Sequence, residues 1–124
     1  MKLNELTLMN DNAITEEQLF EMARIKQADS GLPYVMFAST KEYEPGQHWA
    51  RIKISNIPNT FSKDDNFSIA IINPRVVAGK PKYSQSKVND IIDWVKLNHV
   101  PLMKYWNEEY DSDSEFYDAL EPLK

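Results

Sequence analysis

The chain has 124 residues, of which 42% are hydrophobic, so we expect one domain that builds its own apolar core. It contains no cysteine, which excludes disulfide bonds, zinc-thiolate centres, iron–sulfur clusters and cysteine nucleophiles. The three glycines lie too far apart for a phosphate-binding loop or a dinucleotide-binding turn. The sequence shows neither the apolar run of a signal peptide nor a stretch of membrane-spanning length, so we expect a cytoplasmic protein that does not associate with a membrane.

The formal net charge of −5 is concentrated at the C-terminal end. Residues 98–124 hold seven acids and two lysines, whereas residues 1–97 hold twelve residues of each sign. A basic stretch over residues 72–89 contains no acid and four basic residues: Arg75, Lys80, Lys82 and Lys87. The pattern describes a bipolar protein, although charged residues also serve simply to keep a small domain in solution.

The N-terminal part of the chain predicts a lead-in followed by a helix. Residues 1–14 show little pattern and are expected to be irregular. Residues 15–18 form a capping box, and apolar residues follow at helical spacing, so we expect a helix over 15–28. Gly31 and Pro33 then end that helix.

Three runs that are rich in β-branched and aromatic residues predict strands at 34–40, 49–55 and 67–72. In the second run two isoleucines alternate with Arg51 and Lys53, so the two basic side chains share the face opposite the isoleucines. Polar turns separate the runs, which favours a three-stranded antiparallel meander.

The C-terminal part predicts helices. We expect the basic stretch to stay irregular until the serines at 84 and 86, which offer N-caps for a helix that Pro101 stops or kinks. A second capping box at 112–115 predicts a short last helix that turns Phe116 and Leu120 toward the core. We therefore expect an ordered tail with buried aromatic residues and exposed acids.

Together these elements predict the α+β class. We expect one domain over residues 15–124, with an N-terminal helix, a three-stranded antiparallel sheet and two or three C-terminal helices packed on one face. The acids at the end of the chain place much of the negative charge on those last helices.

No combination of residues in the sequence predicts catalysis, and we expect no catalytic residue, no metal ion and no cofactor. Neither His48 nor His99 is followed by an acid or a second histidine three or four residues later, as in a helical metal site, and a role for His48 stays open. Residues 111–115 imitate the start of a calcium-binding loop but lack its glycine, and Pro122 stands where the loop needs glutamate. The sequence favours a non-enzymatic binding protein.

The acidic end combines carboxylates with aromatic residues. Five aromatic residues lie within residues 105–117, interleaved with or next to six acids. Aromatic side chains anchor protein partners and carboxylates attract a basic groove. We therefore predict a partner-binding surface with eight members: Tyr105, Glu108, Glu109, Tyr110, Asp111, Asp113, Glu115 and Asp118. The alternative is that the aromatic residues fix the last helices to the core while the acids are merely solvated.

A second interpretation assigns nucleic-acid binding to the basic residues. Aromatic residues at 43, 49 and 83 lie near them in sequence or in the predicted sheet, and aromatic rings stack on bases. The predicted nucleic-acid surface has five members: Arg51, Lys53, Arg75, Lys80 and Lys82. The acidic pI of about 5.0 and the lack of an RNA-binding signature count against this interpretation.

Short hydrophobic motifs resemble those of a family of small uncharacterised bacterial and prophage proteins. The motifs are Ser-Gly-Leu-Pro at 30–33, His-Trp-Ala-Arg-Ile-Lys at 48–53 and Trp-Val-Lys-Leu-Asn at 94–98, followed by Leu102 and Trp106. Proteins of this domain-of-unknown-function family are often encoded beside toxin–antitoxin genes. The resemblance implies a mobile-element protein and, as the alternative function, a toxin–antitoxin component that binds RNA.

The acidic end carries a second resemblance. Trp-Asn-Glu-Glu-Tyr at 106–110 and Glu-Phe-Tyr at 115–117 are similar to the C-terminal end of an acidic phage anti-CRISPR protein that mimics DNA. This implies an inhibitor that presents nucleic-acid-like charge to a host or phage protein with a basic groove. The oligomeric state stays open.

Overall fold

The computed structural model describes residues 22–41 and 50–123, in which it has five strands and four helices. In chain order these are β1 (Ala23–Ile25), α3 (Gln27–Ser30), β2 (Met36–Ala38), β3 (Arg51–Ser55), β4 (Asn66–Ala70), β5 (Val76–Gly79), α4 (Gln85–Leu97), α5 (His99–Trp106) and α6 (Asp113–Ala119). The predicted α+β class is confirmed. The lead-in predicted for residues 1–14 lies outside the described residues.

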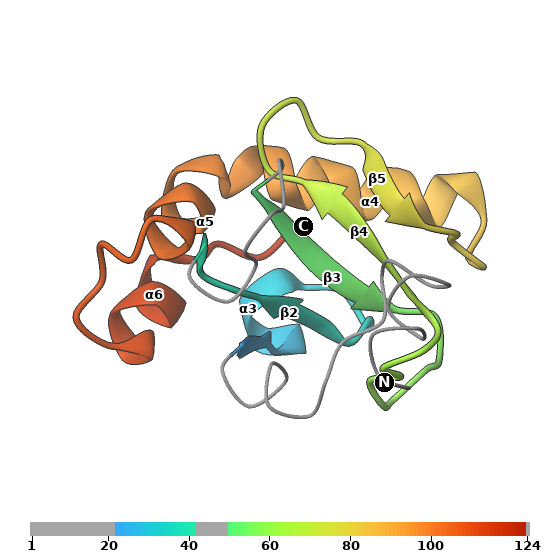
Figure 1. Cartoon of the computed structure of the whole chain (residues 1–124), viewed down its shortest axis with the longest axis horizontal. Coiled ribbons are helices and arrows are strands. Elements are labelled where there is room, and N and C mark those ends of the chain that lie inside the picture. The colour runs from blue at the N-terminus through green and yellow to red at the C-terminus, as the bar shows by residue number, and fades with distance from the viewer. Residues whose placement is uncertain (1–21, 42–49, 124) are drawn as a thin grey trace, which may run out of the picture.

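The strands form one antiparallel sheet in the order β1-β2-β3-β4-β5 (Figure 1). The three predicted strands correspond to β2, β3 and β4, and each is shorter than its predicted run. Strand β4 also begins one residue earlier than predicted, at Asn66. The prediction of three strands is wrong because one further strand pairs at each edge of this meander.

At the first edge, a strand replaces part of the predicted N-terminal helix. Ala23 and Ile25 are each 1% exposed while Arg24 between them is exposed, which is the alternation of a strand. Only Gln27–Ser30 is helical, and residues 15–21 lie outside the described part of the chain. The apolar spacing of so short a segment fits either a helix or a strand, and residues 23–25 form a strand because they pair with β2.

At the other edge, the basic stretch is not irregular throughout. Val76–Gly79 pairs with β4 as β5, with a register irregularity between Ser68 and Ile69 on β4. Consecutive valines favour strand conformation, and Pro74 and Pro81 keep the strand short.

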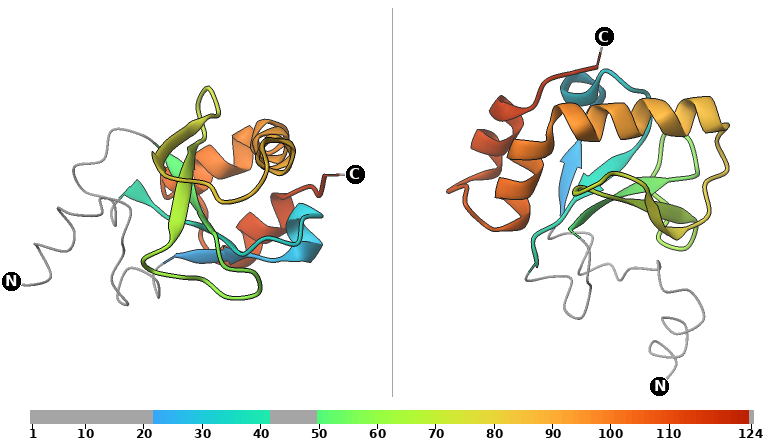
Figure 2. Two further views of the ribbon diagram at one scale, coloured as in Figure 1. Left: turned by 90° about the vertical axis from the view of Figure 1, so that its right-hand side faces the viewer. Right: turned by 90° about the horizontal axis from the view of Figure 1, so that it is seen from above.

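Helix α4 lies across one face of the sheet, and α5 and α6 follow at its C-terminal end (Figures 1 and 2). As predicted, the hydroxyl oxygen of Ser84 caps α4 by accepting a hydrogen bond from the backbone N–H of Lys87. The helix ends at Leu97, and Pro101 stands in the first turn of α5, where its missing N–H disrupts no helical bond. Among the described residues, no helix has both the length and the hydrophobicity needed to cross a membrane.

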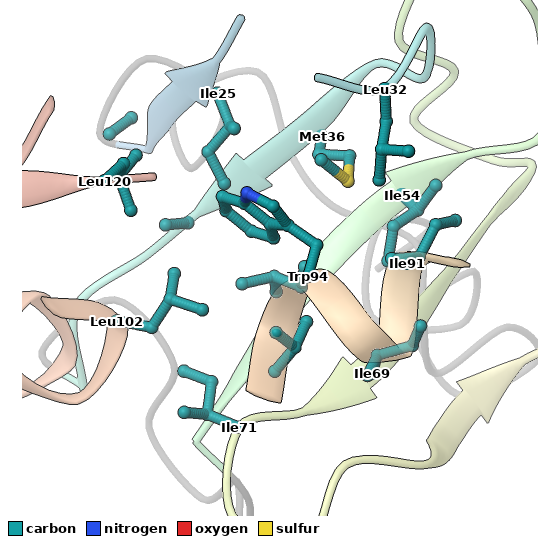
Figure 3. Packing of buried hydrophobic residues seen from close by; sticks show 14 of the residues in the cluster. Ile25, Leu32, Met36, Ile54, Ile69, Ile71, Ile91, Trp94, Leu102 and Leu120 are labelled. Atoms are coloured by element: carbon teal, nitrogen blue, oxygen red, sulfur yellow. The ribbon is translucent and has the colours of Figure 1, made fainter. Parts of the chain in front are cut away.

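The main core fills the space between α4 and the sheet. The Trp94 indole occupies its centre, with strand side chains such as Met36 and Ile54 and the helix side chains Ile91 and Leu102 around it (Figure 3). Its largest fully buried side chains come from the sheet and from all three C-terminal helices: Trp94, Phe67, Phe116, Ile25, Met36, Ile52, Ile54, Ile69, Ile71, Ile91, Leu102 and Val95. The last helices are therefore part of the domain.

Candidate functional site

The acidic end forms a sharp turn between two helices. After α5, the backbone N–H of Glu108 donates to the Tyr105 carbonyl (3.0 Å) and that of Glu109 donates to the Lys104 carbonyl (2.9 Å). Glu108 adopts the left-handed conformation (φ 61°), which a non-glycine residue enters at some energetic cost. The chain thereby reverses and enters α6.

The second predicted capping box is confirmed at its N-cap and differs in its return bond. The Ser112 hydroxyl oxygen accepts from the Glu115 backbone N–H, as in a capping box. The Glu115 carboxylate, however, accepts from the backbone N–H of Asp111 (3.0 Å), one residue before the N-cap. Both bonds fix the start of α6 relative to the turn.

Aromatic side chains pack the turn and α6 against the core. Phe116 is fully buried, and its ring stacks on that of Tyr105 with centroids 4.4 Å apart. The rings of Tyr110 and Tyr117 lie 5.9 Å and 5.6 Å from that of Phe116. The expected burial of Trp106 and Phe116 is confirmed, and Tyr105, predicted as a partner contact, lies within the core.

The six carboxylates predicted for partner binding all reach solvent. Glu108, Glu109, Asp111, Asp113, Glu115 and Asp118 are exposed, and we call this set the acidic face. Within residues 22–41 and 50–123, no lysine or arginine forms an ion pair with any of them. The charge of the acidic face is therefore not neutralised by the described part of the protein.

The nearby carboxylates also affect the pKa values of two tyrosine hydroxyls. Burial raises the pKa of the Tyr110 hydroxyl, and the Glu109 and Glu115 carboxylates raise it further. Burial likewise raises the pKa of Tyr117, with the Asp113 and Asp29 carboxylates adding to the effect. The Lys104 ammonium lies over the Tyr110 ring, 4.9 Å from its centroid, as a cation–π contact.

A hollow of about 250 Å³ opens beside the acidic face. Its walls combine two tyrosines, three carboxylates and two hydroxyl residues: Thr40, Tyr105, Glu108, Tyr110, Asp111, Ser112 and Asp113. Aromatic and carboxylate groups side by side suit an inserted cationic side chain, which gains both cation–π and charge-assisted contacts.

The segment after α6 is attached to the helices through Asn98, for which the sequence predicts no structural role. The Asn98 side chain is buried and donates to the carbonyls of Trp94 (3.0 Å) and Glu121 (2.9 Å). Its amide oxygen accepts from the Glu121 backbone N–H (2.7 Å), and the Trp94 indole N–H donates to the Glu121 carbonyl (2.9 Å). The backbone N–H of Leu123 reaches the Ser30 carbonyl of α3 (2.8 Å), which completes the attachment.

The basic residues predicted for nucleic-acid binding do not share one surface. Arg51 is 4% and Lys53 is 2% exposed, so these two members of the predicted nucleic-acid surface are buried. Their face of the sheet carries a second apolar cluster of Met22, Val35 and Phe37, and Phe37 is the register partner of Lys53.

The remaining basic residues lie near β5. Arg75 donates from Nη1 to the carbonyls of Ile72 (3.3 Å) and Asn73 (2.8 Å). The Lys82 ammonium forms an ion pair with the Asp65 carboxylate at 2.6 Å, and this contact, followed by a hydrogen bond from Asn56, lowers the pKa of Asp65. Lys80 is exposed.

Asn56 is a second buried amide whose role the sequence does not predict. Its Nδ2 donates to the Asp65 carboxylate (2.9 Å) and to the Lys80 carbonyl (3.0 Å), and its Oδ1 accepts from the backbone N–H of Lys82 (2.9 Å). This network fixes the loop between β5 and α4 against the end of β3. The only sequence signal for either amide is an asparagine directly after a strand or a helix, a position that many solvated asparagines share.

In the part of the chain that the structure describes, no histidine belongs to an arrangement that suggests catalysis or metal binding. His99 is exposed at the start of α5, and His48 lies outside the described residues. In the described part of the chain, no three histidine or acidic side chains are grouped so that they could hold a metal ion.

Comparison with known proteins identifies no matching family model, no matching curated protein and no matching solved structure. The resemblances to the prophage family and to the anti-CRISPR protein stay predictions.

Proposed function

We propose that this protein is a non-enzymatic interaction protein of a phage or mobile element, which binds a host or partner protein that has a basic groove. The acidic face is the contact surface. The observation that carries the proposal is that six exposed carboxylates without a described ion-pair partner stand on a folded segment.

The rigidity of the support strengthens this proposal. Phe116 and Leu120 are buried, and the Asn98 network holds the chain that follows α6. A backbone that is already ordered loses little further conformational entropy when a partner binds, so more of the electrostatic attraction appears as affinity. A charged surface also accelerates the encounter with an oppositely charged groove.

The hollow beside the acidic face supports a partner contact of defined chemistry. Its tyrosine and carboxylate walls suit an arginine or lysine side chain that projects from the partner's groove. Tyr105 and Tyr110 would contact the stem of that side chain, while Glu108, Asp111 or Asp113 would receive its charge. In this proposal Tyr105 acts as a wall of the hollow.

The nature of the partner follows from the charge. A groove that accepts a row of carboxylates is chemically suited to accept a row of phosphates, so the proposed partner is a nucleic-acid-binding protein. Occupation of that groove by the acidic face would exclude nucleic acid and thereby inhibit the partner. The resemblance of the C-terminal segment to an anti-CRISPR protein agrees with this proposal.

The test compares two charge reversals of equal size. In affinity capture from a bacterial lysate, E109K/D111K alters the acidic face, and D90K/D93K alters exposed acids of α4. We expect a partner that the wild type and D90K/D93K retain and that E109K/D111K loses. A short DNA duplex added to the captured complex should release that partner. Equal retention by both variants would reject the acidic face as the contact.

RNA binding through the basic residues is the weaker candidate. Only Arg75, Lys80 and Lys82 of its five residues lie on accessible surface, and Lys82 is already paired with Asp65. Phosphate contacts are strongest at low salt, so a binding assay with single-stranded RNA at about 20 mM salt is the most favourable condition. Absence of binding there would remove this candidate.

A further inference from the structure

A groove of about 460 Å³ separates β5 and its following loop from α4, and none of its lining residues belongs to the acidic face. Its walls are mostly apolar: Val76, Pro81 and Tyr83 on one side, Val88 and Ile92 of α4 on the other. Grooves of this size and character accept apolar side chains or small molecules.

The strand beside this groove is the last strand of the sheet. Strand β5 pairs with β4 on one side, and within the described residues no strand pairs with its other side. Backbone N–H and C=O groups on such an edge can pair with an additional strand. Val76 is the register partner of the core residue Ile69, which places its side chain on the face of the sheet that α4 covers. A strand added beside β5 would therefore direct alternate side chains into the groove.

The rim of the groove is basic. Arg75 and Lys80 are its charged residues, and residues 72–89 contain no acid. The Asp65 carboxylate faces Lys82, which is not a groove residue. An occupant that carries carboxylates beside its apolar side chains would thus find complementary charge at the rim.

We infer that the β5 groove binds an extended acidic segment of a partner protein, which adds as a sixth strand to the edge of the sheet. Alternate apolar side chains of the segment enter between Val76 and Ile92, and its carboxylates lie near Lys80 and Arg75. This is the recognition mode in which main-chain hydrogen bonds supply affinity and side-chain grooves supply selectivity. The site is separate from the acidic face and takes a partner of the opposite charge.

The probe is a fluorescently labelled eight-residue peptide that alternates valine with glutamate, measured by fluorescence anisotropy with the full chain. We expect saturable binding that weakens as salt rises, and about tenfold weaker binding by K80E, since one charge-assisted contact becomes repulsive. The matched control is K96E, which makes the same change at an exposed position of α4 outside the groove and should bind as the wild type does.

Two further peptides separate strand addition from simple charge attraction. A peptide that alternates valine with lysine should not bind, and a glutamate peptide with N-methyl groups on its backbone amides should lose affinity because it cannot donate main-chain hydrogen bonds. I92Q should weaken binding, whereas L97Q, an exposed leucine on the same helix, should not. Circular dichroism establishes that each variant is folded.

The inference is overturned if binding of the valine–glutamate peptide does not saturate by about 1 mM of protein, or if K96E and K80E reduce the affinity equally. Retained affinity of the N-methylated peptide would exclude strand addition. The variant E109K/D111K should bind the peptide like the wild type, so the result is independent of the function proposed for the acidic face.

Discussion

The acidic face and the β5 groove carry opposite charge, and the fold supports them in different ways. The acidic face stands on aromatic packing around Phe116, and none of its carboxylates is paired with a described basic residue. The loop beside the β5 groove is instead held by a polar network, in which Asn56 and Asp65 bind the backbone and side chain of Lys82. The carboxylates of the acidic face thus have no described ion-pair partner, whereas Lys82, beside the β5 groove, is paired with Asp65 and stabilises the loop.

This difference has a consequence for function. The Lys82 charge that is paired with Asp65 has less to offer a partner, and the groove relies on its apolar walls and on Lys80 and Arg75. The acidic face is held mainly by apolar contacts, and among its carboxylates only Glu115 is also used in the described structure, as the acceptor of the Asp111 N–H. The following changes test each half of this comparison.

The largest effect is expected from removal of residues 112–124. The deletion removes Phe116 and Leu120, whose burial contributes roughly 1.5–3 kcal/mol each, and also the partners of Asn98. We expect the melting temperature to fall by more than about 10 °C in differential scanning calorimetry. An unchanged melting temperature would show that the acidic end is a solvated appendage, and a segment that folds only on its partner would then replace the rigid surface.

Asn98→Ala should have the next largest effect. It leaves the Glu121 N–H without its acceptor in a partly buried position, which costs about 2–4 kcal/mol together with the other lost bonds. Urea denaturation measures the change, and hydrogen exchange should show faster exchange at Glu121. Asn89→Ala removes an exposed amide of α4 and serves as the control. Equal effects of the two variants would mean that Asn98 does not hold the tail.

Asn56→Ala tests the support of the basic end. It breaks three side-chain hydrogen bonds to Asp65, Lys80 and Lys82, and we expect a loss of about 1–3 kcal/mol in free energy of unfolding. The same variant should bind the valine–glutamate peptide more weakly, because the backbone at Lys80 is no longer fixed at the rim of the groove. Capture of a partner by the acidic face should not change. Loss of that capture would show that the two ends are not independent.

Local signals in the sequence predicted the C-terminal half well. A serine cap at Ser84, a proline near the start of α5 and the box at 112–115 each act through neighbouring backbone groups, so they hold whatever the rest of the fold does. The exposure of the six acids followed from their charge.

The remaining features depend on contacts between distant residues. Ala23–Ile25 is a strand because β2 lies beside it, and Val76–Gly79 is a strand because β4 does. Arg51 and Lys53 lie on the predicted face of β3, yet that face is covered, which alternation alone does not reveal. Asn98 and Asn56 bind carbonyl groups more than 20 residues away, so no local pattern identifies them.

The smallest effect is expected from acid titration of the Asp65–Lys82 pair. Because the Lys82 ammonium and the Asn56 amide lower the pKa of Asp65 in the folded protein, the carboxylate releases its proton more readily there than in the unfolded chain. Its contribution to stability is therefore complete above the ordinary aspartate pKa of about 4 and is lost as the pH falls through the lowered folded value. The pair is largely solvated, so the contribution should stay below about 1 kcal/mol. The stabilities of Asp65→Asn and wild type, measured by urea denaturation at a series of pH values, should differ at pH 6 and converge as the pH falls through the lowered pKa of Asp65. A difference that persists unchanged into acid would assign the effect of Asp65 to its hydrogen bonds, and the charge of Lys82 would then be available to a partner.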